Sequence, residues 1–192
     1  MIFTCRIAEK MYNVTHVLFQ TRHRDDFGGV PLQKERTTMY EHVILAADGS
    51  EACKEAIKEV NRLIQHGCIK KLTILNAVNN LAESINADGT GIMMSPTMTT
   101  ELYELNKLVG TKVVSATRQM IEGDIEIDEK VLFGNPPDVI CDAAVSENAD
   151  LIVMGSRGQN PLKGLLLGSA SMRVLQCAHC AILIAKVPEH HK

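Results

Sequence analysis

The sequence predicts an α/β protein with an open parallel five-stranded sheet and helices on both faces, a Rossmann-like arrangement. Two observations lead to this fold class. From Tyr40 onward, short strand-like runs alternate with segments of helical periodicity, which is the signature of successive β–α–β units. The run DLIVM, residues 150–154, is apolar after its first residue, as in strands that are buried on both faces of a parallel sheet.

The first strands and helices follow from residues 42–121. The run HVILAA, residues 42–47, predicts a strand that ends at Asp48. Ser50 is a good N-cap for the helix that follows, and Gly67 would end that helix. Residues 71–78 predict the second strand, and a long polar loop continues to about Thr99. Residues 100–121 then predict an amphipathic helix, whose apolar residues step by three or four: Leu102, Leu105, Val109, Val113, Ala116 and Met120.

The second half of the chain continues the alternation. Pro136 or Pro137 can begin a helix, because the first turn of a helix does not need the N–H that proline lacks. The final run, AILIAKV, is apolar on both faces although it would lie at the edge of the sheet, which favours pairing with another chain. The predicted elements are a strand at 125–133, a helix at 138–148, a strand at 150–154, a helix at 169–177 and a strand at 181–187.

Composition and charge limit the function classes. A chain of 192 residues with 45% hydrophobic and 22% charged residues has the composition of an ordinary globular domain. Its formal net charge of −3 gives no basic surface for nucleic acid or anionic lipid. No apolar run approaches the roughly 20 residues of a membrane-spanning helix. We therefore expect a cytoplasmic protein that binds neither nucleic acid nor membrane.

The N-terminal residues and the cysteines give two further expectations. Residues 1–38 do not follow the α/β alternation, so we expect an irregular extension before a domain at 39–192. Met39 is a natural start of translation. A native product that began at Met39 would lack this extension. The six cysteines lie mostly in apolar periodic segments, where a thiol behaves as a small hydrophobe. We expect no disulfide framework.

The glycine-rich segment MGSRGQNPLKGLLLGSAS, residues 154–171, is the strongest candidate for a binding site. It follows the fourth strand, and ligands of open parallel sheets bind beyond the carboxyl ends of the strands. Gly155 and Gly158 leave room for backbone N–H groups to converge on an anion, and Gly168 precedes a helix N-terminus that favours phosphate. Arg157 and Lys163 carry positive charge to the same segment. The spacing matches neither GxGxxG nor a P-loop, so a loop that merely connects strand and helix stays an alternative.

The chain resembles the universal stress protein family, in its ATP-binding branch, over residues 40–187. The resemblance is carried by VILAADGSEACKEAI, by NPPDVICDAAVSENADLIVMGSRG, by the G-2x-G-9x-G-[ST] spacing and by LLLGSASMRVLQCAHCAILIAKV. It implies the strand order 3-2-1-4-5, ATP with Mg or Mn on its phosphates, and a homodimer through residues 181–187. It also implies a nucleotide-dependent stress-response regulator or sensor that a protein partner reads.

The resemblance also implies the ligand-binding residues. Neither Ala46 nor Ala77 has a side chain that would distinguish adenine from another base, so phosphate binding is the firmer expectation. Ala46 and Asp48 would lie near the adenosine, and Ala77 against the adenine. The ribose and phosphates would contact Met154, Gly155, Ser156, Arg157 and Gly158. The phosphate tail would contact Gly168, Ser169, Ala170 and Ser171.

Other suggestive residues have simpler interpretations. Cys177 and Cys180 form a CxxC that could be a redox pair or half a zinc site, but a single CxxC is a weak signal and packing is favoured. We interpret His42 as a residue at a strand edge. No paired acid and base lie next to the glycine loop, so we predict slow or no ATP hydrolysis. The alternatives are an interaction or dimerisation module of the same fold that binds no nucleotide, and a weak ATPase.

Overall fold

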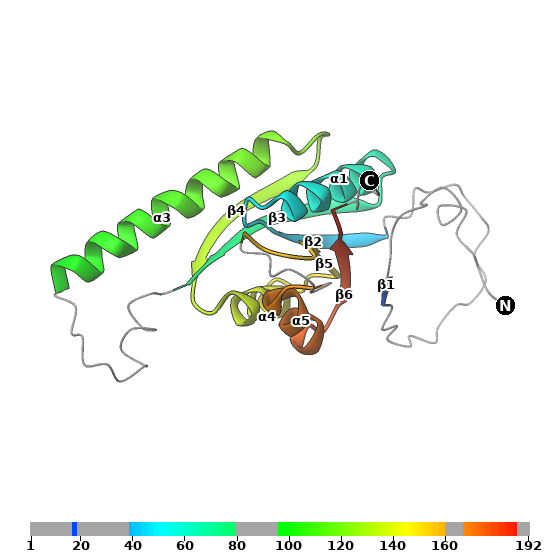
Figure 1. The fold of residues 1–192 in the computed structure, drawn as a ribbon. Helices are drawn as coiled ribbons and strands as arrows, with labels where there is room; N and C mark the ends of the chain where they lie inside the picture. The colour runs from blue at the N-terminus through cyan, green and yellow to red at the C-terminus, as the bar shows by residue number, and fades with distance from the viewer. Residues whose placement is uncertain (1–16, 19–38, 80–95, 160–166, 188–192) are drawn as a thin grey trace, which may run out of the picture.

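The computed structural model describes residues 17–18, 39–79, 96–159 and 167–187, which form one sheet flanked by helices (Figure 1). The side chains of residues 17, 18 and 96 are outside this description. The elements are β1 (Val17–Leu18), β2 (Tyr40–Ala46), α1 (Glu51–Gln65), β3 (Ile69–Val78), α3 (Pro96–Gln119), β4 (Glu126–Phe133), α4 (Pro136–Ser146), β5 (Leu151–Gly155), α5 (Ser169–Cys177) and β6 (Ala181–Ala185).

The sheet has the order β1-β6-β5-β2-β3-β4. Its five strands from β2 onward are all parallel, and their order is the predicted 3-2-1-4-5 when they are numbered along the chain. The predicted fold class is therefore confirmed. The order reverses between β2 and β5, where Ala46 pairs with Met154, and this is the point at which parallel sheets open a crevice.

β1 is an addition that the sequence pattern did not predict. Val17 pairs with Leu183 and Leu18 with Ile182, in antiparallel orientation, so part of the N-terminal extension covers the outer edge of β6. Two residues are too few to leave an alternating pattern in a sequence. The division of the chain at residue 39 stays a prediction.

Two apolar cores lie on opposite faces of the sheet. In β2 the side chains alternate, so that Val43 and Leu45 join the core beneath α1 and α3 while Ile44 joins the core above α4 and α5. All three are fully buried. Figure 1 shows the two pairs of helices on the two sides of the sheet. Each such side chain contributes about 1.5–3 kcal/mol through its burial.

Helix ends agree with the sequence signals at α1 and shift at α3 and α4. The Ser50 hydroxyl accepts a hydrogen bond from the Cys53 N–H at 3.1 Å, as expected of an N-cap, and Gly67 has a φ of +68° just beyond α1. α4 begins at Pro136, in the first turn where proline is tolerated. α3 begins at Pro96, four residues before the expected start, within the segment that was expected to be a loop.

α3 is rotated relative to what its amphipathic pattern suggests. An apolar stripe ordinarily faces the core, yet Leu105, Val109 and Met120 are 55%, 51% and 43% exposed. Of the predicted stripe, Val113 packs against the core, and the sheet is contacted through Gly110 and Val114. A Cβ atom on Gly110 would lie 2.7 Å from Val131 Cγ1 and 2.8 Å from Asn76 Oδ1, so only glycine permits this approach.

One disulfide corrects the expectations about the cysteines. Cys141 in α4 and Cys177 in α5 are bonded, with their Cα atoms 6.2 Å apart and a sequence separation of 36 residues. The CxxC cysteines are therefore not bonded to each other, and Cys180 is a free thiol. The interpretation of Cys177 as a packing residue is incomplete, because its sulfur is bonded to Cys141. The sequence spacing could not reveal this pair, because it arises where two helices meet across the α4–α5 contact.

Candidate functional site

The loops after β2 and β5 come together at the strand-order reversal. The Ser50 hydroxyl donates to the Arg157 carbonyl oxygen at 3.3 Å, and the Gln159 amide donates to the Asp48 carbonyl oxygen. A Cβ atom on Gly158 would lie 3.1 Å from Asp48 Oδ2. Two segments more than 100 residues apart in sequence thus form one surface, as the sequence analysis expected for Asp48 and the glycine loop.

Asp48 is held in a fixed orientation by its own turn. Its Oδ1 atom accepts a hydrogen bond from the Ser50 N–H at 2.9 Å, which closes an Asx turn. Gly49 has a φ of +76°, a backbone conformation that glycine adopts without strain. The second carboxylate oxygen is thereby directed to Gly158, where it can accept hydrogen bonds or contact a cation.

The two halves of the glycine loop lie against each other. The Gly168 N–H donates to the Ser156 carbonyl oxygen at 2.7 Å, and the Ser171 hydroxyl donates to the Gly155 carbonyl oxygen at 3.0 Å. A Cβ atom on Gly168 would lie 3.4 Å from Arg157 Cα and 3.7 Å from the Gly158 nitrogen. Residues separated by about ten positions therefore form one cradle, which we call the glycine cradle: Ser156, Arg157, Gly158, Gly168 and Ser169.

The N-terminus of α5 opens at this cradle. Gly168 is the N-cap of α5 and has no side chain with which to accept a hydrogen bond from the first turn. The first turn contains no acidic residue. Its N–H groups and the positive end of the helix dipole therefore favour an anion at this place.

A buried hydroxyl group without a partner marks the same cradle. Ser156 is 1% exposed, and within the described part of the chain its Oγ atom has no hydrogen-bond partner. Its backbone is fixed, since the Ser156 N–H donates to the Ala185 carbonyl oxygen at 2.7 Å. A buried hydroxyl without a partner costs about 1–3 kcal/mol, which a bound polar atom would recover. The residues present thus fit a polyanionic ligand.

Several predicted site residues support the loop and offer no side chain to a ligand. A Cβ atom on Gly155 would lie 2.7 Å from the Ala52 carbonyl carbon, so this glycine permits β5 to approach the start of α1. Met154 is 6% exposed and belongs to the core above α4 and α5. Ser171 is 2% exposed and its hydroxyl is already used. Ala46 and Ala77, both partly buried, pack against the same core.

Sequence reasoning missed two residues that shape the site. Asn76 is 8% exposed, and its amide donates to the Ala47 carbonyl oxygen at 2.6 Å, which fixes the end of β2. Gln159 attaches the glycine loop to the Asp48 backbone. A polar residue inside an apolar strand was the available signal for Asn76. Lys163 lies outside the described residues.

A buried polar network lies near the other ends of the strands. His42 is 9% exposed, and its Nε2 lies 2.8 Å from Thr73 Oγ1. The Thr73 hydroxyl donates to Glu147 Oε2 at 2.8 Å, and Lys130 Nζ lies 3.0 Å from Glu147 Oε1. The interpretation of His42 as a strand-edge residue is wrong, because β2 is central in the sheet and the ring is enclosed between Thr73 of β3 and Glu147 at the end of α4.

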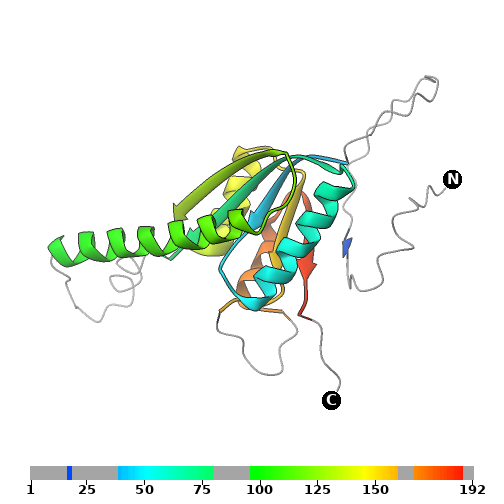
Figure 2. The same cartoon turned by 90° about the horizontal axis from the view of Figure 1, so that it is seen from above.

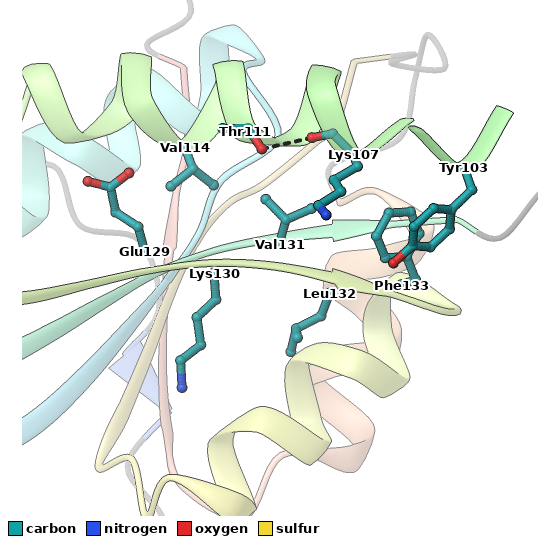
Figure 3. Close-up of a pocket in the computed structure, with 9 residues that line it drawn as sticks. All are labelled: Tyr103, Lys107, Thr111, Val114, Glu129, Lys130, Val131, Leu132 and Phe133. Atoms are coloured by element: carbon teal, nitrogen blue, oxygen red, sulfur yellow. Dashed lines mark hydrogen bonds between the residues drawn. The ribbon is translucent and has the colours of Figure 1, made fainter. Parts of the chain in front are cut away.

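Two hollows border α3, and neither contains the glycine cradle. One of about 470 Å³ lies between α3 and β4, where the Tyr103 and Phe133 rings stack with centroids 4.3 Å apart. Figure 3 shows Glu129 and Val131 pointing toward α3 in this hollow, whereas Lys130 and Leu132 point to the other side of β4. The second, of about 310 Å³, lies between α1 and α3.

The described residues contain neither a cluster of metal ligands nor a membrane-spanning helix. In residues 39–79, 96–159 and 167–187, no three His, Cys, Asp or Glu side chains gather as metal ligands would. None of the described helices combines the length and the hydropathy that crossing a bilayer requires.

The fold and this loop define a class of open parallel α/β proteins with a glycine-lined cradle at the strand-order reversal. Residues 39–186 match the universal stress protein family, and the chain belongs to that family. It is 30% identical to a universal stress protein of Thermus aquaticus over 149 residues, which cover 77% of this chain and all of that protein.

Two solved structures are similar in fold. UspA from Lactobacillus plantarum superposes with a TM-score of 0.62 at 23% identity, covering 76% of this chain and 97% of that one. A universal stress protein family protein of Arabidopsis thaliana with AMP bound has a TM-score of 0.51 at 19% identity, covering 77% and 92%.

Proposed function

We propose that this chain is an ATP-binding universal stress protein that acts as a nucleotide-dependent regulator or sensor. The observation that carries the proposal is the glycine cradle, in which the α5 N-terminus lies against the backbone of Ser156 and Arg157 while Gly158 lies beside Asp48. A similar fold that is described with AMP bound supports an adenine nucleotide as the ligand.

Each part of ATP would find a chemically suitable group. The phosphates would accept hydrogen bonds from the first turn of α5 and from Ser156, with Arg157 nearby as a cation. The Asp48 carboxylate would repel phosphate, so it suits ribose hydroxyls or a Mg or Mn ion on the phosphates. Ala46 and Ala77 have no polar side-chain atoms, so discrimination between bases would depend on backbone groups.

ATP would be hydrolysed slowly or not at all. Phosphoryl transfer to water needs a positioned base or a group that orients the water. In the described parts of the two loops, Asp48 is the acidic side chain, and its Oδ1 already accepts the Ser50 N–H. The regulatory output would instead be a population shift between loop arrangements, which a protein partner reads.

A homodimer through residues 181–187 and a cytoplasmic location remain predictions. Ile182 and Leu183 of β6 pair with β1. A second chain could pair with these positions of β6 only after β1 had left the edge.

Released nucleotide and ATP titration test the proposal. The purified protein is denatured and its supernatant is analysed for nucleotide, and ATP with Mg is then titrated calorimetrically. Gly168→Val places a branched side chain in the cradle, and the Gly168 φ of −74° is compatible with valine. Ser115→Val on the exposed face of α3 is the matched control. We expect binding to the wild type and the control, and weakened binding to Gly168→Val.

Two results would decide for the alternatives. An absence of both released nucleotide and binding heat would favour the interaction module that binds no nucleotide. Phosphate release at several turnovers per second would favour an ATPase over a sensor.

A further inference from the structure

The Cys141–Cys177 disulfide and the glycine cradle lie at opposite ends of one short helix. The first turn of α5 opens at the cradle, and its last residue, Cys177, is bonded to Cys141 of α4. A helix of nine residues rises about 13 Å from end to end. A movement of α5 as a unit would therefore change the cradle.

α5 depends on its contact with α4. The two helices lie together on one face of the sheet, and α1 and α3 cover the other (Figure 1 and Figure 2). Helices shorter than about 12 residues are marginal by themselves, so α5 needs packing, and its buried residues are Ser171 and Val174. Arg173 lies 4.0 Å from Asp138 of α4, but both side chains are more than half exposed, so this ion pair contributes little. The disulfide is therefore a principal restraint on α5.

Both redox states of the cysteine pair are compatible with the fold. Cys141 Sγ lies 4.0 Å from the Val174 carbonyl oxygen, and Cys177 Sγ lies 3.8 Å from the Pro137 carbonyl oxygen. A thiol is a weak hydrogen-bond donor, so each sulfur of the reduced pair has an acceptor within reach. Reduction thus breaks the covalent bond without leaving a buried polar group unpaired. The bond can therefore open and form again within the folded protein.

The two cysteines differ in access. Cys141 is 6% exposed, whereas Cys177 is partly exposed at the end of α5. Reagents from solution therefore reach Cys177 more easily than Cys141. Disulfides of proteins in reducing compartments are mostly transient, catalytic or redox-sensing. For the cytoplasmic location predicted above, this rule favours a switch over a permanent cross-link.

We propose that the Cys141–Cys177 pair is a redox site that controls the order of α5 and, through it, the affinity of the glycine cradle. In the oxidised form α5 is fixed, and the N–H groups of its first turn converge on the anion. In the reduced form α5 is less restrained, and the cradle binds its ligand more weakly. The inference rests on the proposed function for the identity of that ligand, ATP.

The co-reactant is a low-molecular-weight disulfide. The Cys177 thiol loses its proton and attacks one sulfur of this disulfide, which forms a mixed disulfide and releases one thiol. The Cys141 thiol then loses its proton and attacks the Cys177 sulfur, which forms the Cys141–Cys177 bond and releases the second thiol. The two cysteines are oxidised, the small disulfide is reduced, and the two protons leave on the two small thiols. Reduction of the protein is the reverse sequence.

Equilibration with glutathione tests whether the site is reversible. The protein is incubated in mixtures that range from mainly oxidised to mainly reduced glutathione, free thiols are alkylated, and peptides containing Cys141 and Cys177 are quantified by mass spectrometry. Both cysteines should change together from bonded to free across this range. A bond that persists in every mixture with excess thiol would be a structural cross-link and would overturn the proposal.

Amide hydrogen exchange tests the coupling without any ligand. Reduction of the wild type should cause a loss of protection in residues 169–177, whereas α1 should keep its protection. Cys177→Ala should resemble the reduced protein with and without reductant. Cys180→Ala, which retains the bonded pair, is the matched control and should respond like the wild type. Equal protection of α5 in the oxidised and reduced wild type would contradict the inference.

ATP titration measures the effect on the cradle. The Kd for ATP with Mg should be about fivefold or more higher for the reduced wild type than for the oxidised protein. Cys177→Ala should bind like the reduced form, and Cys180→Ala should respond to reductant like the wild type. An equal Kd for both forms of the wild type would overturn the inference. If ATP binds neither form, the proposed function fails, and the redox control of α5 is then decided by the exchange measurement alone.

Discussion

The Oδ2 atom of Asp48 lies 3.1 Å from the position that a Cβ atom on Gly158 would occupy. This contact joins the end of β2 to the glycine cradle. Gly158→Ala should therefore push the carboxylate aside while leaving the backbone relaxed, since Gly158 has no positive φ. We expect the Kd for ATP to rise about tenfold, about 1.4 kcal/mol, in calorimetric titration. An unchanged Kd would show that the Asp48 carboxylate does not contact the bound ATP.

Ser156→Ala distinguishes a hydroxyl that serves a ligand from one that serves the fold. The Oγ atom has no hydrogen-bond partner among the residues that the structure describes, so its removal should leave the unliganded Tm unchanged or slightly higher. The increase in Tm on adding ATP should become smaller. Both temperatures are measured by differential scanning fluorimetry. A fall in the unliganded Tm would show that the hydroxyl stabilises the protein itself.

Gly110→Ala should destabilise the protein although alanine favours helices. Alanine gains about 1 kcal/mol in helix propensity, but its Cβ would overlap the Val131 and Asn76 side chains. Overpacking of this kind costs about 1–3 kcal/mol, so we expect a net loss in the free energy of unfolding. Urea denaturation measures it. Ser115→Ala, on an exposed position of α3, is the control and should be neutral or stabilising.

Loss of the Cys141–Cys177 disulfide should weaken the contact between α4 and α5. Closing a loop of 36 residues stabilises a protein by about 4 kcal/mol in the chain-entropy description. The double variant Cys141→Ala, Cys177→Ala should therefore have a lower Tm than the oxidised wild type. Reducing agent should lower the Tm of the wild type and leave the variant unchanged. Equal sensitivity of both proteins would contradict the pairing.

The ion pair between Lys71 and Asp128 gives a pH dependence. Lys71 Nζ lies 2.8 Å from Asp128 Oδ2, and this hydrogen bond lowers the pKa of the Asp128 carboxyl below its ordinary 3.8. A lowered carboxyl pKa contributes stability above the ordinary value, and that contribution is lost as the pH falls through the folded-state value. Urea denaturation curves of the wild type and Asp128→Asn should differ at pH 7 and approach each other as the pH falls below the ordinary carboxyl pKa. In a Lys71→Met background the difference at pH 7 should be smaller.

The strands were predictable because each one is short, apolar and bounded by turn residues. β2 to β6 therefore appear in the sequence with errors of one to two residues at most of their ends. The position of the cradle was predictable for a related reason. Asp48 and Gly155 follow two strands directly, and the carboxyl ends of parallel strands lie at one edge of the sheet.

Contacts between distant segments could not be predicted from local patterns. The rotation of α3 depends on Gly110, whose missing Cβ matters only because Val131 and Asn76 lie opposite. A periodic apolar stripe predicts that a helix buries one face, but it does not say against what. His42 was misinterpreted because its partners, Thr73 and Glu147, come from β3 and the end of α4. The Cys141–Cys177 bond also joins two segments that are distant in the sequence, so no local pattern predicts it.

The network around His42 has a consequence for the location of a proton in the middle of the sheet. His42 Nδ1 faces the Glu147 carbonyl oxygen at 3.1 Å, and a carbonyl can only accept, so Nδ1 carries hydrogen. While the Thr73 hydroxyl donates to Glu147, the Thr73 oxygen can only accept from His42, so Nε2 must be the donor. If Nε2 carries no hydrogen, the Thr73 hydroxyl must turn away from Glu147 and donate to Nε2. The direction of one buried O–H bond and the position of one hydrogen on the imidazole are therefore linked.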